Sequence, residues 1–563
     1  MTNMKKDDIY GLIRENIRAL APYSTARDEC KIDMEVYLDA NESPYETGVN
    51  RYPSPFQEEL KRMVSSIRRV PVENIFLGNG SDEAIDLIYR IFCTPGKSSA
   101  VVVAPSYGMY SVAGNINDVK IIYSELDSEF QLNATKLLSD VQDDTRVVFI
   151  CSPNNPSGNL LDREEIIRII ENFNGIVVVD EAYIDFAESQ SFSELIGRYP
   201  NLIVLQTLSK AWGMAGLRLG IALADTITIG TMNKVKYPYN ISIINQQKAI
   251  EMLKDCVGTV ERIREIKENR SKLAMELSQM ECVSKVYPSD ANFLLVKFKE
   301  REKVFKELQE RKIIVRDRSS QLHCKDCLRI TMGTEDENRR LLDAIREITG
   351  EIESKAGPSS KKEGCITEGK KCRVGKVSRS TRETSIQVCI NLDSFTRPYV
   401  RSGLPFFDHM LEQIGYHGGI GVDIICCGDI ATGCHHTVED TGIALGEALA
   451  QALGPKKGIE RYGFALPMDE ADAMVLIDLG GRIDFKWDVE FREQFVGEID
   501  TQMFSHFFKS LAENLKCNLH VKAKGENDHH IIEGVFKAFA RALKCAVRKD
   551  EFSYGVASSK GVL

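Results

Sequence analysis

The sequence predicts an α/β domain with a largely parallel sheet, a smaller α+β domain, and a duplicated α+β unit. Two observations lead to this prediction. Residues 70 to 230 alternate β-rich apolar runs with helix-like segments, a pattern typical of α/β folds. Residues 373 to 563 carry His-His-x-x-Glu twice, beginning at His435 and at His529. Similar apolar helices surround both copies, which indicates an internal repeat of about 95 residues.

The elements follow in order along the chain. The apolar runs of the first part are NIFLGNG, SAVVVAPSY, RVVFICSPNNP, GIVVVDEAY, LIVLQTLSK and LRLGIALA. Residues 245–349 are richer in amphipathic helices, which indicates the smaller α+β domain. Residues 354–371 are rich in Gly, Ser and Lys with little apolar content, as expected of a linker. We therefore expect a first part at 1–353 (large domain about 45–240, small domain about 1–44 and 241–353), a linker at 354–371, and a two-repeat part at 372–563.

Composition excludes several classes of protein. The 563 residues carry a net charge of −10, whereas a nucleic-acid binder is normally basic. No apolar run approaches the ~18 residues that span a membrane, and the N-terminal segment lacks the apolar core of a secretory signal. The fifteen cysteines are scattered and are expected to be reduced thiols. We therefore expect a cytoplasmic enzyme without nucleic-acid or membrane partners.

Several chemical groups follow strands of the first part. Lys210 follows one apolar run, Asp180 ends another, and Asn155 follows a third, while Gly80 and Ser81 open a helix. Carboxyl-end loops of a parallel sheet meet at one edge, where ligands bind. A lysine for a Schiff base, an aspartate for a ring nitrogen, and helix N–H groups for a phosphate suit pyridoxal phosphate.

The first 350 residues resemble histidinol-phosphate aminotransferase, a fold-type-I pyridoxal-phosphate enzyme, through DANESPYE, RYPSP, SYGMY, CSPNNPSGN, DEAY, TLSKAWGMAGLR and CLRITMGT. The resemblance implies Lys210 as the Schiff-base lysine and proton shuttle and Asp180 at the ring nitrogen. The other cofactor residues that it implies are Asn155 and Tyr183 at the ring oxygen, Tyr110 stacked on the ring, and Ser209 and Arg218 at the phosphate. The substrate residues that it implies are Arg329, with Tyr23, Asn41 and Arg316 close by, and Tyr52 from a partner subunit.

Histidine gathers in the second part, which holds eight of the nine in the chain. Residues i and i+4 share a helix face, so His435 can bind one ion with Glu439, and His529 another with Glu533. The second histidine of each pair points elsewhere, so a pseudo-twofold relation between the repeats would give His530 to the first ion and His436 to the second. His409 and His506 would complete three histidines and one glutamate for each ion. These ligands permit Zn, Fe, Ni or Mn.

Residues 373–563 resemble imidazoleglycerol-phosphate dehydratase through RSTRET, FFDHMLEQIGYH, HHTVEDTGIALGEAL, GIERYG, PMDEA, GENDHHIIEGVFKAFARAL and SSKG. The resemblance implies two Mn(II) ions. Their ligand sets would be His409, His436, His529 and Glu533, and His435, Glu439, His506 and His530. It also implies Glu383 as an acid or base. The substrate residues that it implies are Arg461, Arg482, Lys537, Ser558, Ser559 and Lys560. Gly433 and Cys434 stand where relatives carry acidic residues.

The two resemblances imply consecutive reactions. Imidazoleglycerol phosphate would be dehydrated to imidazole-acetol phosphate, and that ketone would be transaminated with glutamate to histidinol phosphate. The alternative is an aminotransferase of broader specificity joined to an inactive metal-binding scaffold. The resemblances also imply aminotransferase dimers and a dehydratase cage of about 24 chains.

Overall fold

The computed structural model describes residues 6–21, 36–350, 372–381, 383–428, 433–463 and 466–549. The chain divides into two compact units. The first contains Met1–Lys61, Val70–Glu251 and Glu261–Ser360. The second contains Arg62–Arg69, Met252–Val260 and Lys361–Leu563.

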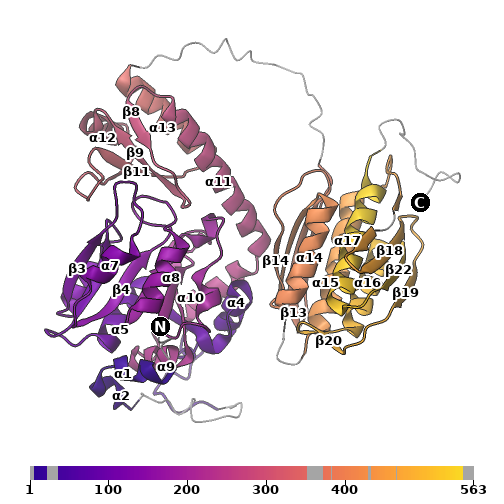
Figure 1. The fold of residues 1–563 in the computed structure, drawn as a ribbon, viewed down its shortest axis with the longest axis horizontal. Coiled ribbons are helices and arrows are strands. Elements are labelled where there is room, and N and C mark those ends of the chain that lie inside the picture. The colour runs from indigo at the N-terminus through magenta and orange to yellow at the C-terminus, as the bar shows by residue number, and fades with distance from the viewer. Residues whose placement is uncertain are drawn as a thin grey trace. The chain divides into compact units, whose positions relative to one another are not determined.

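The first unit is built on a mixed sheet with the order β1-β7-β6-β5-β4-β2-β3 (Figure 1). Its strands are β1 (Ile75–Asn79), β2 (Ser99–Ala104), β3 (Lys120–Glu125), β4 (Thr145–Cys151), β5 (Ile176–Asp180), β6 (Leu202–Thr207) and β7 (Leu219–Ala224). β7 is antiparallel to β1 and β6, and the other pairs are parallel. β5 and β6 are buried throughout, as expected of central strands covered on both faces. The expected α/β class is confirmed.

Helices and short 3₁₀ turns precede, connect and follow these strands. They are α1 (Lys6–Leu12), α2 (Glu15–Arg18), α4 (Glu58–Arg68), η1 (Val72–Asn74), α5 (Ser81–Phe92), α6 (Met109–Ile116), α7 (Ala134–Asp140), α8 (Arg163–Asn172), η2 (Ile184–Phe186), η3 (Phe192–Leu195), η4 (Ala215–Leu217), α9 (Thr226–Val235), α10 (Ile243–Leu253) and α11 (Cys256–Ser278). The apolar face of α5 is buried in the core that it shares with the sheet. That packing fixes the helix start next to the end of β1.

A separate small sheet has the order β10-β11-β9-β8. Its elements are β8 (Val283–Val286), β9 (Phe293–Phe298), α12 (Arg301–Glu310), β10 (Arg316–Asp317), β11 (Cys327–Thr331) and α13 (Glu335–Thr349). α13 starts with a capping box between Thr334 and Glu337, which satisfies free N–H groups at the helix start. In the register of the small sheet Arg316 lies opposite Arg329, so two guanidinium groups come from one edge.

The second unit contains the same sheet twice. The strand orders are β12-β13-β15-β14 and β16-β18-β22-β19, and β17 pairs with β18. Both four-strand orders contain one parallel pair, β14 with β15 and β19 with β22. The strands are β12 (Val374–Ser380), β13 (Thr384–Asn391), β14 (Tyr399–Arg401), β15 (Gly421–Gly428), β16 (Tyr462–Gly463), β17 (Leu466–Met468), β18 (Ala471–Asp478), β19 (Asp484–Val489), β20 (Phe495–Val496), β21 (Ile499–Asp500) and β22 (Asn518–Lys524). The predicted internal repeat is confirmed by this topology.

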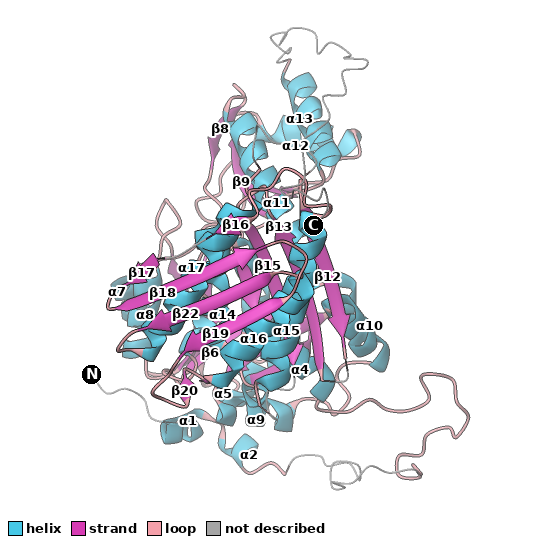
Figure 2. Ribbon diagram, turned by 90° about the vertical axis from the view of Figure 1, so that its right-hand side faces the viewer, coloured by secondary structure: helices cyan, strands magenta, loops and turns pink. Residues whose placement is uncertain are grey.

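Four helices lie between the two sheets (Figure 2). They are α14 (Pro405–Gly418), α15 (His435–Leu453), α16 (Gln502–Leu515) and α17 (Asp528–Val547). α15 packs closely on α16 at two glycines, Gly442 and Gly446. A Cβ added at either glycine would lie 2.6 Å from a backbone carbonyl oxygen of α16, so only glycine allows this close approach. α14 packs against α17 in the same way that α15 packs against α16. These two helix pairs place side chains of both repeats next to each other.

Candidate active sites

A cavity opens where β4, β5 and β6 end. Every residue that was expected to hold the cofactor lines it, except Tyr110. The lining residues are Gly80, Ser81, Asp82, Tyr107, Cys151, Asn155, Asp180, Ala182, Tyr183, Thr207, Ser209, Lys210 and Arg218. The carboxyl-end loops therefore meet at one edge of the sheet, as the sequence predicts.

Tyr110 lies behind this cavity and not against a ring inside it. Its ring is fully buried and stacks on Phe149, with centroids 5.0 Å apart. Its hydroxyl donates to Oδ2 of Asp180 at 2.6 Å. Two aromatic residues line the cavity wall, Tyr107 and Tyr183, and the hydroxyl of Tyr107 donates to Asp82 at 3.1 Å. The expected stacking of Tyr110 on a ring in this cavity is therefore corrected, because its ring is buried against Phe149 and does not reach the wall.

Asp180 ends β5 and is almost completely buried. The backbone N–H of Ala182 donates to its Oδ1 at 3.0 Å, in addition to the bond from Tyr110. Burial raises the pKa of Asp180, and these two hydrogen bonds only partly oppose the effect. A cation next to this carboxylate would therefore be strongly stabilising.

Lys210 faces the same cavity from the loop after β6. Its Nζ lies 5.8 Å from the ring centroid of Tyr183. Loss of hydration in the cavity wall lowers the pKa of Lys210, and the positive charge of Arg329 lowers it further. The amine of Lys210 therefore loses its proton at a lower pH than the amine of a free lysine does.

Three arginines of the small sheet gather beside Tyr183 and Asn155. Arg329 donates to Oδ1 of Asn155 at 2.5 Å. Burial lowers the pKa of Arg318 to about 10, and the charges of Arg329 and Arg316 contribute to the shift. The Nε atoms of Arg318 and Arg329 are buried without a hydrogen-bond partner among the described residues. The cluster of Arg316, Arg318 and Arg329 is thus suited to an anion. Arg318 was not among the expected residues, although it stands two residues after Arg316.

Among the other substrate residues expected in the first part, Tyr52 and Asn41 do not line this cavity within one chain. Tyr52 is half exposed and stacks on Tyr239 with ring centroids 4.4 Å apart. Asn41 lies in a partly exposed loop with φ of 55°. Tyr23 lies outside the described residues.

Three groups of possible metal ligands lie among the described residues of the second unit, and one of them is Asp469, Glu470 and His530. The other two lie between helices. One consists of His409, His529 and Glu533, and the other of His435, Glu439 and His506. In each group the ligand atoms lie within 4.8 Å of one another. α14 and α17 supply the first of the two groups between helices, and α15 and α16 supply the second.

Individual distances within these groups agree with a shared ion. His435 Nε2 lies 3.1 Å from Glu439, and its ring centroid lies 5.5 Å from that of His506. In the other group, Glu533 lies 3.5 Å from His529 and 4.0 Å from His409. Three nitrogen and oxygen donors converge in each case, as a transition-metal site requires.

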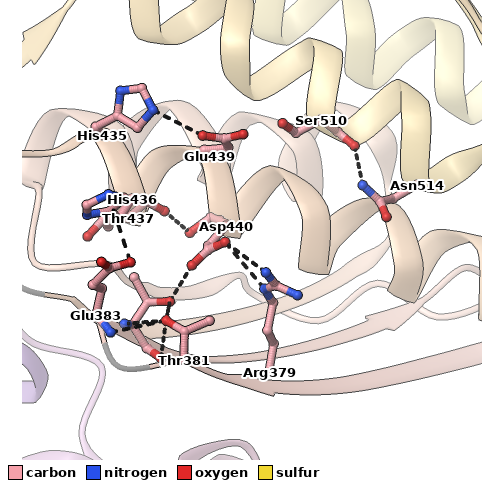
Figure 3. Close-up of polar contacts among 12 residues, drawn as sticks. Arg379, Thr381, Glu383, His435, His436, Thr437, Glu439, Asp440, Ser510 and Asn514 are labelled. Atoms are coloured by element: carbon pink, nitrogen blue, oxygen red, sulfur yellow. Dashed lines mark hydrogen bonds and ion pairs between the residues drawn. The ribbon is translucent and has the colours of Figure 1, made fainter.

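His436 and His530 belong to neither of these two groups within one chain. Adjacent helical residues point about 100° apart, so each faces a different carboxylate from its neighbour in sequence. His436 Nε2 lies 3.9 Å from Glu383 (Figure 3), and His530 Nδ1 lies 2.9 Å from Glu470. In a single chain, therefore, only three of the four expected ligands of each ion come together.

The substrate residues expected in the second part are spread over this unit. Lys537 Nζ lies 2.9 Å from Glu533, so it contacts one metal group. Arg461 is held by Asp478 at 2.6 Å, and Arg482 is exposed between β18 and β19. Ser558, Ser559 and Lys560 lie outside the described residues.

Comparison with known proteins identifies relatives of both parts. Residues 28–345 match the family model for aminotransferase class I and II, and residues 402–543 match that for imidazoleglycerol-phosphate dehydratase. The histidinol-phosphate aminotransferase of Parabacteroides distasonis is 50% identical over 341 residues, covering 61% of this chain and 99% of that protein. The corresponding enzyme of Cytophaga hutchinsonii is 48% identical, covering 60% of this chain and 97% of that protein.

A solved structure agrees with the first part of the fold. The histidinol-phosphate aminotransferase of Clostridium acetobutylicum superposes with a TM-score of 0.50 at 25% identity, covering 54% of this chain and 92% of that one. Within the described residues, no helix has the length and apolar character needed to cross a membrane. The match over more than half of its length, together with the second match near its C-terminal end, shows that the chain belongs to the class I and II aminotransferase family and carries an imidazoleglycerol-phosphate dehydratase domain.

Proposed function

We propose that the chain is a bifunctional enzyme of histidine biosynthesis. Its second part dehydrates imidazoleglycerol phosphate to imidazole-acetol phosphate. Its first part transaminates that ketone with glutamate to L-histidinol phosphate. The observation that carries the proposal is the presence, in one chain, of both family matches, each over a part that holds a suitable constellation of residues.

The residues of the first cavity fit pyridoxal 5'-phosphate. A protonated ring nitrogen beside Asp180 would offset the cost of burying that carboxylate. The free N–H groups at the start of α5, next to Ser81, suit a phosphate. A Cβ added at Gly80 would lie 2.8 Å from Nη2 of Arg218, so glycine leaves the room that the phosphate cradle needs. When bound, the cofactor supplies an electron sink for the amino-group carbon.

Lys210 is the acid–base group that this chain contributes to transamination. Its lowered pKa keeps a larger fraction of the amine neutral, which a proton shuttle near neutral pH requires. Tyr183 stays protonated, because burial raises the pKa of its hydroxyl. It can therefore donate a hydrogen bond to the cofactor ring oxygen, opposite Asn155.

The arginine cluster provides the selectivity for a phosphorylated substrate. Arg316, Arg318 and Arg329 place three permanent charges at one side of the cavity, and planar guanidinium groups bind phosphate oxygens in pairs. An uncharged substrate end would leave their buried Nε atoms unpaired, which costs free energy. Tyr52 of a partner subunit and Asn41 and Tyr23 of the same chain complete the site.

The two histidine groups fit divalent metal ions, and we assign Mn(II) to them. Imidazole nitrogens and carboxylate oxygens suit Mn(II), although they also suit Zn, Fe and Ni. When bound, two cations favour the ionised imidazole of the substrate and so help to expel its hydroxyl group. Glu383 then moves the remaining proton. The substrate is bound by Lys537, Arg461, Arg482, Ser558, Ser559 and Lys560.

Each metal site is completed by a second copy of the chain. Three ligands converge within one chain, and the fourth, His436 or His530, points to another neighbour. We therefore propose a cage of about 24 dehydratase parts that carries aminotransferase dimers. The free thiols of the described cysteines suit a reducing compartment such as the cytoplasm.

The test supplies the purified chain with Mn(II) and imidazoleglycerol phosphate, without glutamate. Imidazole-acetol phosphate is expected to accumulate, and a chelator is expected to stop its formation. A chain that binds Mn(II) but forms no ketone would instead favour the alternative of a broader-specificity aminotransferase joined to an inactive scaffold.

A further inference from the structure

Glu383 stands at the tip of the hairpin formed by β12 and β13, and the tip is tightly hydrogen-bonded. The Oγ1 atom of Thr381 accepts from the backbone N–H of Glu383 at 3.2 Å and from that of Thr384 at 2.9 Å. The backbone N–H of Thr381 donates to the carbonyl of Thr384 at 2.8 Å. These bonds fix the backbone from which the Glu383 side chain projects.

One carboxylate of α15 fastens this tip to the helix. Thr384, on β13, donates its hydroxyl to Oδ2 of Asp440 at 2.5 Å. Arg379, on β12, donates to Oδ1 of Asp440 through Nε at 3.3 Å and Nη2 at 3.2 Å (Figure 3). The Asp440 side chain is only 13% exposed, so water competes little for these bonds. Asp440 thus holds both strands of the hairpin at once.

The position of Asp440 on α15 connects this contact to the chemistry. His436 and Asp440 are four residues apart and share one face of the helix. Glu383 lies 3.9 Å from His436 on that face. His435 and Glu439 form the neighbouring face, which belongs to a metal group. Asp440 therefore links the hairpin that carries Glu383 to the helix that carries His435 and Glu439.

We propose that Asp440 is a positioning residue for the dehydration step, acting through Glu383. The proposal rests on the proposed dehydratase function and deepens it. Asp440 belongs to none of the groups of possible metal ligands, and its two oxygens are occupied by Thr384 and Arg379. Its effect is to hold the proton-transferring carboxylate at the distance that the reaction needs.

A purely structural role predicts a different result, and the same hairpin offers a control. At its opposite end, Asp393 accepts from the side chain of Arg373 at 2.7 Å and from its backbone N–H at 2.8 Å. Asp393→Asn therefore removes a similar carboxylate–guanidinium contact that lies far along the hairpin from Glu383. It should lower the melting temperature without changing the kinetics of dehydration.

The experiment measures kcat and KM for dehydration of imidazoleglycerol phosphate in the full chain loaded with Mn(II). Asp440→Asn should lower kcat about 10- to 100-fold, as expected for a misplaced catalytic group, with KM changed less than about twofold. Thr384→Val should lower kcat in the same direction, and Thr384→Ser, which keeps the hydroxyl, should restore it. In a Glu383→Gln background, Asp440→Asn should cause no further loss, because both changes remove the same contribution.

Three outcomes would overturn the proposal. These are an unchanged kcat in folded Asp440→Asn, a loss in Asp393→Asn equal to that in Asp440→Asn, or additive losses in the double variant. If Asp440→Asn fails to fold, the Thr384→Val and Thr384→Ser pair decides by the same criterion. An unmodified chain without any dehydration would refute the proposed function itself, and this result is distinct from all three.

Discussion

The hydrogen bond between Tyr110 and Asp180 should strengthen cofactor binding, although Tyr110 does not line the cavity. Tyr110→Phe removes one hydroxyl from a fully buried ring and keeps its stacking on Phe149. The 2.6 Å bond to Asp180 is lost. Because that bond lowers the pKa of Asp180, the carboxyl group becomes harder to ionise without it.

The magnitude follows from the charge of Asp180 in the two states. With the cofactor bound, the carboxylate is ionised beside a protonated ring nitrogen, and a hydrogen bond to a charged group contributes about 1.5–3 kcal/mol. Without the cofactor, burial favours the neutral carboxyl group, whose hydrogen bond contributes about 0.5–1.5 kcal/mol. The difference of about 1–1.5 kcal/mol corresponds to an affinity about 5- to 13-fold weaker.

The assay titrates pyridoxamine phosphate into the apoprotein, because this form of the cofactor cannot bond covalently to Lys210. The matched control is Tyr89→Phe. The Tyr89 hydroxyl is equally buried but donates to the backbone carbonyl of Tyr110 at 2.8 Å, so its loss should affect stability and not affinity. A folded Tyr110→Phe variant with an unchanged dissociation constant would refute the reasoning.

Three further predictions follow from the sites. Arg318→Gln should raise KM for histidinol phosphate about 10-fold or more while leaving any reaction with unphosphorylated histidinol unchanged; equal effects on both substrates would contradict a phosphate contact. The rate at which pyridoxal phosphate attaches to Lys210 should reach half its maximum at a pH below 10.5. The neutral amine attacks the aldehyde, and a lowered pKa makes the amine neutral at lower pH. A half-maximum at or above pH 10.5 would contradict the lowered pKa of Lys210. Removal of the metal by a chelator should stop dehydration but not transamination, and it should shrink the particle measured by light scattering. The His435→Ala and His529→Ala variants should each bind one ion fewer. A plain dimer that is fully active with Mn(II) would contradict the shared metal sites.

Much of the fold was predictable, because hydrophobic patterns mark buried strands. Six of the strands in the large sheet coincide with apolar runs, but β3 does not. Its sequence KIIYSE mixes polar and apolar residues, since most of β3 is exposed or only partly buried. The repeat was also predictable, because the motif His-His-x-x-Glu occurs in both copies. Each metal group between helices takes its ligands from one helix of either copy.

The errors concern side-chain direction, which a motif does not encode. SYGMY offers two tyrosines, and only the start of α6 at Met109 determines that Tyr110 turns toward the sheet while Tyr107 faces the cavity. The histidine pairs show the same limit. Helix geometry predicts that His436 and His530 diverge from their neighbours, but sequence alone does not say whether their ion lies in the same chain. Arg318 was missed because its role depends on the pairing of β10 with β11.

The central claim is that one chain carries out both reactions in sequence. The most direct measurement supplies the chain, loaded with pyridoxal phosphate and Mn(II), with imidazoleglycerol phosphate and glutamate, and follows histidinol phosphate. The unmodified chain should form histidinol phosphate, whereas Lys210→Ala should stop at imidazole-acetol phosphate at an unchanged rate of dehydration. Failure of the unmodified chain to form histidinol phosphate, or loss of dehydration in a folded Lys210→Ala variant, would contradict the account.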